Sequence, residues 1–162
     1  MALDPIPAFD LSQQLFLLSA AIHCSREPMV ISTVLGSCVA VCLWDTVQRI
    51  GGMNHFVLPR SHSDGPDSRY GDSAIDQLVD RMLDLGCRRE TMEAKLFGGA
   101  AVLAGTPEHS VGTRNVELAF ERLRHHGIVV VAHRTGGENG MLIRMFTGTG
   151  DVLARPIGRD QV

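Results

Sequence analysis

Hydrophobic and polar positions alternate along much of this chain with the short period that is typical of β-strands. Strands are predicted over residues 15–24, 29–35, 38–45, 50–59, 128–134, 141–147 and 151–157, and residues 92–103 are predicted to form a strand that runs into a glycine turn. Segment 38–45, CVAVCLWD, is apolar on both faces, which indicates a strand covered on both sides in the middle of a layered protein. The short polar connection DTVQR favours an antiparallel hairpin between this strand and the next one.

Two segments have the longer period of amphipathic helices. The first covers residues 72–86, and the second covers about 113–126, each followed or closed by a glycine. The strands cluster before the first helix and after the second, so strict alternation of strand and helix fails. The pattern therefore predicts an α+β fold, a mixed β-sheet sandwich of about seven or eight strands with two main helices packed on one side.

The length of 162 residues favours one domain, which we expect to cover residues 15–162. Residues 1–14 carry two prolines and no period, so a flexible N-terminal leader is predicted there. A net charge of −3 gives no general reason to expect nucleic acid as a partner. No apolar run approaches the ~20 residues that span a bilayer, and acidic residues precede LFLLSAAI (15–22), unlike a secretory signal. A cytoplasmic protein without membrane insertion is the expectation.

The four cysteines, Cys24, Cys38, Cys42 and Cys87, are expected to be reduced thiols in such a protein. Cys38 and Cys42 lie four residues apart in one predicted strand, which separates them by roughly 13 Å. A disulfide needs Cα atoms about 4.4–6.8 Å apart, so the strand excludes that pair.

Cys38 follows Gly36 and Ser37 at the start of an apolar strand, and His55 lies in the strand predicted to pair with it. The hairpin would bring the two side chains together, as a cysteine hydrolase requires. An imidazole beside the thiol can hold it as a thiolate and lower its pKa by several units. The turn of Gly36, Ser37 and Cys38 could offer backbone N–H groups to an oxyanion. From spacing alone, a buried core thiol and a satisfied interior histidine remain the alternatives.

Other chemistry finds little support in the sequence. The adjacent pairs His23–Cys24 and His125–His126 lack the spacing of zinc ligands, so no metal is expected. The glycine pairs in LFGGAAVL and RTGGENG match neither the phosphate-loop pattern nor the dinucleotide pattern, so no cofactor is expected.

Several segments resemble the CheD family of chemoreceptor glutamine deamidases. They are TVLGSCVAVCLWD, GGMNHFVLP, RYGDSAIDQLVDRMLDLG, EAKLFGGA, VGTRNVELAFERL and RTGG, which follow the order of the family between about residues 29 and 155. The resemblance implies a cysteine-dependent protein-glutamine amidohydrolase. It would convert selected glutamines of methyl-accepting chemotaxis receptors to glutamates and release ammonia.

The resemblance also implies the residues of the site. Cys38 would be the nucleophile and His55 the general base. The third family residue is a threonine shortly before the Gly-Ser-Cys turn. Counting back six residues reaches Ser32, whereas the threonine is Thr33, and strand alternation sends these two side chains to opposite faces.

The substrate implied by the resemblance is a glutamine on the long cytoplasmic helices of a receptor, so loops 60–71 and 135–140 are candidates for the rim of an open cleft. A CheC-type phosphatase is a possible partner, and a regulatory binding module with little catalysis is the alternative function. Hydrolysis of receptor glutamyl methyl esters would be a related side activity.

Overall fold

The computed structural model describes residues 13–101 and 107–158, and within them nine strands and two long helices are present. The strands are β1 (Gln14–Phe16), β2 (Ile22–Ser25), β3 (Val30–Leu35), β4 (Val39–Asp45), β5 (Gly51–Asn54), β6 (Met92–Gly98), β7 (Val129–Thr135), β8 (Gly140–Phe146) and β9 (Val152–Ile157). The helices are α1 (Gly71–Asp84) and α2 (Val111–His125), with short 3-10 helices η1 (Arg89–Thr91) and η2 (Pro107–His109).

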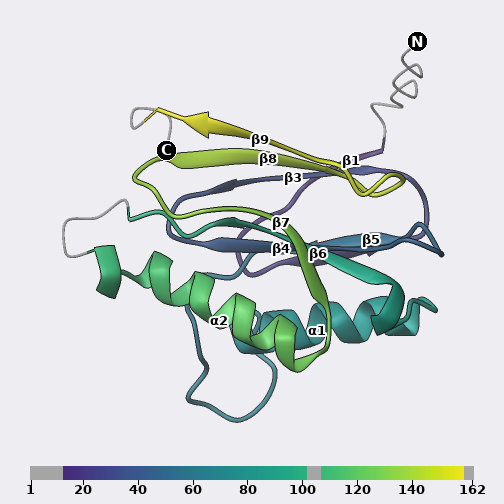
Figure 1. Cartoon of the computed structure of the whole chain (residues 1–162), viewed down its shortest axis with the longest axis horizontal. Coiled ribbons are helices and arrows are strands. Elements are labelled where there is room, and N and C mark those ends of the chain that lie inside the picture. The colour runs from purple at the N-terminus through teal and green to yellow at the C-terminus, as the bar shows by residue number, and fades with distance from the viewer. Residues whose placement is uncertain (1–12, 102–106, 159–162) are drawn as a thin grey trace.

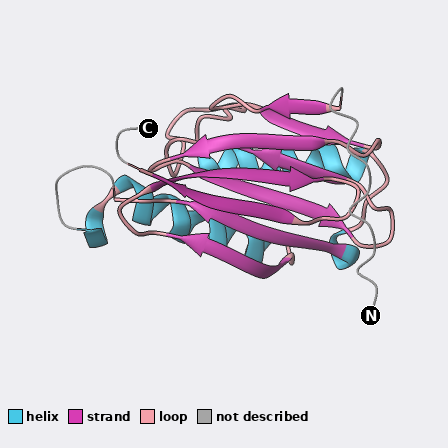
Figure 2. Cartoon of the chain, turned by 90° about the horizontal axis from the view of Figure 1, so that it is seen from above, coloured by secondary structure: helices cyan, strands magenta, loops and turns pink. Residues whose placement is uncertain are grey.

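The strands form two mixed sheets that pack face to face. One has the order β1-β3-β8-β9, and the other has the order β2-β5-β4-β6-β7. Both helices cover the outer face of the five-stranded sheet, and the four-stranded sheet covers its inner face (Figure 1). Seen from above, the strands lie over the two helices (Figure 2). The predicted α+β sandwich with two helices on one side is confirmed.

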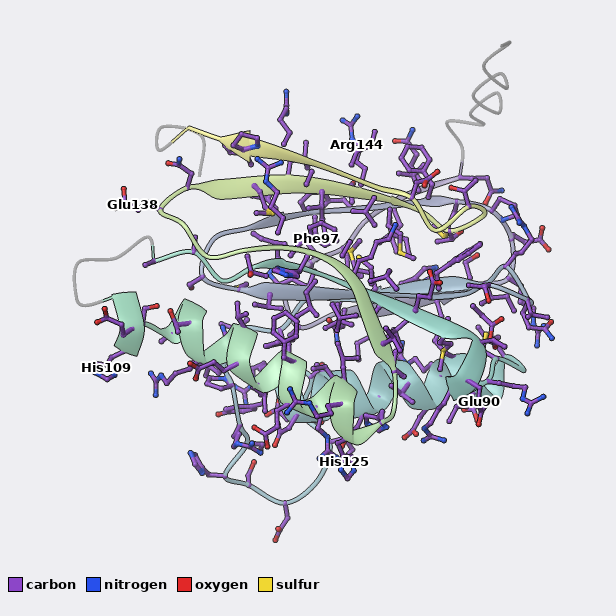
Figure 3. All side chains as sticks on the ribbon, viewed as in Figure 1. Glu90, Phe97, His109, His125, Glu138 and Arg144 are labelled. Atoms are coloured by element: carbon purple, nitrogen blue, oxygen red, sulfur yellow. The ribbon has the colours of Figure 1, made fainter. Side chains whose placement is uncertain are left out.

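Strand β4 lies at the centre of the five-stranded sheet and is buried on both faces, as its apolar pattern predicts. Val39, Val41 and Leu43 belong to the core beneath the helices. Ala40 and Cys42 belong to the core between the sheets, where Phe97 also lies (Figure 3). The residues just before and after β4 therefore mark the two ends of a central strand that is buried on both faces.

The predicted strand 15–24 is two strands, which is why the structure has more strands than the expected seven or eight. Ala20 has a φ of 65°, and this left-handed residue turns the chain between the sheets. As a result β1 joins the four-stranded sheet and β2 joins the five-stranded sheet. Residues 1–12 of the predicted leader lie outside the described residues, and Gln14 begins β1.

The predicted strand 50–59 also ends early, because β5 stops at Asn54. The Asn54 side chain accepts a hydrogen bond from the Val41 backbone N–H at 2.8 Å, so it takes the place of a ladder carbonyl. One further bridge, between Val39 and Phe56, continues the pairing beyond this irregularity. His55 therefore lies between the end of β5 and this bridge.

Candidate active site

Cys38 lies one residue before β4, at the end of the tight turn that leaves β3. Its side chain is partly buried and packs against the core between the two sheets. Its carbonyl accepts a hydrogen bond from the Gly99 N–H at 2.9 Å, and the Gly36 carbonyl accepts one from Ala100 N–H at 3.0 Å. A side chain at Gly98 would overlap the Cys38 carbonyl oxygen. The glycine turn after β6 thus holds the Gly36–Cys38 turn by its backbone.

His55 and Cys38 lie on the same face of the β4–β5 pair. The register pairs Cys42 with Met53, and the Val39–Phe56 bridge keeps that register. The same register places His55 opposite Ala40, two residues from Cys38 on the face toward the other sheet. Such diagonal neighbours have Cβ atoms on the order of 7 Å apart. The predicted hairpin therefore places Cys38 and His55 as diagonal neighbours on the same face.

Thr33 reaches the same place from the four-stranded sheet. Its hydroxyl donates to the Leu17 carbonyl at 2.7 Å and lies 2.7 Å from His55 Nδ1. A hydroxyl has one proton, and a carbonyl can only accept, so the Thr33 oxygen accepts from Nδ1–H. The lone pair of neutral His55 is then on Nε2, the nitrogen that a general base would use.

Ser32 lies on the opposite face of β3. It pairs with Arg144 of β8, whereas Thr33 pairs with the buried Ile143. Directly opposed residues share a face, and Arg144 lies on the outer face of the four-stranded sheet (Figure 3). Of the two residues left open by the sequence, the structure brings Thr33 and not Ser32 to His55.

The pKa values of the two reactive groups move in directions that the sequence did not predict. Burial lowers the pKa of His55 to about 4. Burial also raises the pKa of the Cys38 thiol, and a hydrogen bond from its own backbone N–H offsets only part of that effect. Both charged forms are disfavoured, so the resting pair is a thiol and a neutral imidazole. Burial thus works against the expected thiolate with a lowered pKa, which stays a prediction.

The two loops predicted to form the rim lie in different places. Gly136 N–H donates to the Gly98 carbonyl at 2.9 Å, and Ala101 N–H donates to the Gly137 carbonyl at 2.8 Å. Loop 135–140 is therefore attached to the glycine turn beside Cys38, and Glu138 lies at that end of the sandwich (Figure 3). Loop 60–71 extends from the helix side of the molecule instead (Figure 1).

Sequence reasoning missed Asn115 of α2, which is completely buried. Its amide donates to the Ser37 carbonyl and to the Val57 carbonyl, both at 3.0 Å. Asn115 precedes Ala119 by four residues, so it lies on the buried face of the helix. A polar residue at such a position is the signal that could have singled it out.

All four cysteines are free, and burial raises the pKa of Cys42 to about 12. Residues 13–101 and 107–158 contain no group of three or more His, Cys, Asp or Glu side chains that could hold a metal ion. In the same ranges no helix is long and apolar enough to cross a membrane.

A thiol, an imidazole and an orienting hydroxyl at one end of a β-sandwich form an arrangement typical of cysteine hydrolases. Comparison with known proteins identifies the family. The family described as CheD chemotactic sensory transduction matches residues 57–156. The chain belongs to the CheD family.

Individual relatives agree with this assignment. A probable chemoreceptor glutamine deamidase CheD of Rhodospirillum rubrum is 55% identical over 88% of this chain and 81% of its own. A protein of the same name from Trichlorobacter lovleyi is 46% identical over 85% of this chain and 87% of its own. The crystal structure of the Bacillus licheniformis hypothetical protein YfiH aligns with a TM-score of 0.48 at 14% identity, over 72% of this chain and 49% of that one. That last likeness is too low to establish a shared fold.

Proposed function

We infer that this chain is a chemoreceptor glutamine deamidase with Cys38 as nucleophile, His55 as general base and Thr33 as the residue that orients the base. The inference rests on family membership and on one observation above all. The 2.7 Å contact of Thr33 with His55 Nδ1 leaves Nε2 free to take a proton on the face that Cys38 shares. Cytoplasmic helices of methyl-accepting chemotaxis receptors are the proposed substrate, which places the protein in the cytoplasm.

The first half of the reaction forms an acyl-enzyme. His55 Nε2 takes the Cys38 proton as Sγ attacks the side-chain carbonyl carbon of the glutamine, and the carbonyl oxygen becomes an oxyanion. The Gly36–Cys38 turn supplies backbone N–H groups to that oxyanion. The imidazolium then protonates the amide nitrogen, the C–N bond breaks, and ammonia leaves a thioester on Cys38.

Water completes the reaction. Neutral His55 removes a proton from a water molecule that attacks the thioester, and the C–S bond breaks to give glutamate and the free thiol. Because the resting thiol is protonated, proton transfer accompanies attack rather than preceding it. The side activity on glutamyl methyl esters and the CheC-type partner stay predictions.

The test is incubation of the protein with a receptor cytoplasmic fragment, followed by mass spectrometry of its peptides. Conversion of Gln to Glu adds about one dalton per site, and we expect Cys38→Ala to lower the rate by more than about 1,000-fold. Cys42→Ala is the matched control, because Cys42 is a buried thiol on the same strand face and we expect it to keep near wild-type activity. Deamidation that survives Cys38→Ala would overturn the proposal.

A further inference from the structure

We propose that Asn115 is a positioning residue that sets the direction of the Cys38 backbone N–H, and so prepares the oxyanion site. Its side chain does not touch the thiol. It acts through the peptide bond that joins Ser37 to Cys38. The proposal rests on the function inferred above, since it assigns a role within the same site.

The peptide bond from Ser37 to Cys38 links the Asn115 contact to the nucleophile. In a planar trans peptide the carbonyl and the following N–H point in opposite directions. The Asn115 amide binds the Ser37 carbonyl at 3.0 Å from the helix side. The Cys38 N–H therefore points away from Asn115. This N–H belongs to the same residue as Sγ, so the donor lies only a few bonds from the atom that attacks the substrate.

The second contact of Asn115 fixes the opposite strand. The β4–β5 register places Val57 opposite Cys38, and the Val57 carbonyl accepts the other N–H of the Asn115 amide at 3.0 Å. Strand β5 itself ends at Asn54, and the Val57 N–H bonds instead to the Arg69 carbonyl at 2.8 Å. One side chain thus connects the nucleophile turn to the segment that carries His55, where the regular ladder has stopped.

The helix is placed to make this connection. A Cβ at Gly112 would lie 2.5 Å from the Gly99 carbonyl oxygen, so the start of α2 packs closely on the glycine turn after β6. Gly99 in turn binds the Cys38 carbonyl at 2.9 Å. This close approach brings Asn115, one helical turn further on, within reach of the Ser37 carbonyl.

The unused atom of the amide argues against a purely structural role. Both N–H groups of Asn115 face carbonyls, so its Oδ1 is fixed on the other side, where it is buried without a partner among the described residues. A buried acceptor without a partner lowers stability, and such groups in native structures need an explanation. Here the loss of stability accompanies a fixed orientation of the Ser37–Cys38 peptide bond.

Two small electrophiles separate this role from the others. p-Nitrophenyl acetate acylates a thiol through a tetrahedral oxyanion. The S–C bond forms, the ester C–O bond breaks, and p-nitrophenolate leaves. Iodoacetamide alkylates the same sulfur with loss of iodide and forms no oxyanion. The ratio of the two rates, measured at Cys38 by peptide mass spectrometry, reports oxyanion stabilisation independently of how much thiolate is present.

We expect Asn115→Leu, which keeps the side-chain shape without donors, to lower the acylation rate ~10- to 100-fold while the alkylation rate changes less than about twofold. Asn115→Ala gives the same ratio if leucine is not accommodated, with thermal unfolding used to check that each variant is folded at the assay temperature. Leu118→Ala is the control, because Leu118 is buried on the same helix one turn further on and its loss should lower stability without changing the ratio. An unchanged ratio in the Asn115 variants would overturn the proposal.

The wild-type protein and the Asn115 variants distinguish failure of the deamidase function from failure of the positioning role. A wild-type protein that leaves receptor glutamines unchanged contradicts the proposed deamidase function. The acylation-to-alkylation ratio can still fall in the Asn115 variants of that protein. If glutamines are converted but the ratio does not depend on Asn115, only the positioning role fails.

Discussion

Strand β4 begins one residue after Cys38 and ends at Asp45, so a buried polar cluster lies at each end of the same strand. Asp45 is completely buried, and both of its carboxylate oxygens are satisfied. Oδ1 accepts from the N–H groups of Val47 and Gln48, and Oδ2 accepts from the Arg88 N–H and the Thr91 hydroxyl. These bonds fasten the β4–β5 turn to the segment before β6.

The opposite end of the strand is built differently. Among the described residues, the buried Asn115 Oδ1 and Asn54 Nδ2 have no hydrogen-bond partner, and the contact of His55 with Thr33 uses Nδ1 and leaves Nε2 free. Burial raises the pKa of Asp45, but its hydrogen bonds outweigh that effect and the net pKa is lowered. At the Cys38 end the effect of burial is not offset for His55 and is offset only in part for Cys38, so the pKa of His55 falls and that of Cys38 rises. The satisfied Asp45 carboxylate holds the fold together, whereas the His55 Nε2, on the strand face that Cys38 shares, is available for chemistry.

The largest effect should follow from breaking the cluster at the Cys38 end with Thr33→Val. The valine has the same shape, but it leaves the His55 Nδ1–H and the Leu17 carbonyl without their common partner. We expect the deamidation rate to fall by about 100-fold, because the base loses its fixed tautomer and orientation. Rates on a receptor fragment at saturating concentration give the measurement.

Ser32→Ala is the matched control for Thr33→Val, since it removes a neighbouring hydroxyl from the opposite face of β3. Its rate should stay within about twofold of wild type, as is usual for a side chain outside such a cluster. A Ser32 variant that loses more activity than the Thr33 variant would contradict the assignment of the orienting residue.

Part of this arrangement is predictable from the sequence. The pattern of residues 38–45 was enough to place β4 at the centre of the fold, because a strand that is apolar on both faces has few other places. The family resemblance left Thr33 and Ser32 as candidates for the third site residue, and alternation along β3 means that only one of them can face His55. Only the pairing with β8 decides which of these faces inward, because it sets the buried side of the strand.

The rest depended on tertiary contacts that leave weak traces in the sequence. The break within 15–24 depends on the left-handed conformation of Ala20. A glycine is the usual sequence signal for that conformation, and none is present at this position. The early end of β5 follows from a side chain, Asn54, that replaces a ladder carbonyl. The neutral resting state of Cys38 and His55 depends on burial, and residue spacing alone does not specify burial.

The next largest effect is expected from a substitution of Asp45, at the other end of β4. In Asp45→Asn the new amide NH₂ group faces N–H and O–H donors whose hydrogen bonds the carboxylate accepts in the wild type. We therefore expect a loss of about 2 kcal/mol in the free energy of unfolding. Urea unfolding at pH 7 measures it. The specific activity of the folded variant should stay close to wild type, and a large loss of activity would show that the two ends are not independent.

Acid provides a second measure of the same carboxylate. The pKa of Asp45 is lower in the folded state than in the unfolded state. The contribution of Asp45 to the free energy of unfolding is therefore present above the unfolded pKa of about 4, and it is lost as pH falls through the folded pKa. Wild type should therefore lose stability below about pH 4 more steeply than Asp45→Asn. Parallel unfolding curves for the two proteins would contradict the role given to the carboxylate.

The smallest effect concerns the difference in charge between the two ends of β4. It is measured by the pH dependence of Cys38 alkylation by iodoacetamide. Only the thiolate reacts, and burial holds the pKa of this thiol above its usual value. We expect the rate to rise about tenfold per pH unit from pH 6 to pH 8.5, with no plateau. A resting thiolate–imidazolium pair would instead give a rate that is already constant in this range.

His55→Gln should leave the slope unchanged, because the pKa of His55, about 4, keeps the imidazole neutral throughout this pH range. A plateau that disappears in His55→Gln would therefore show that the two groups exchange a proton before substrate arrives, and that the Cys38 end is charged at rest as the Asp45 end is.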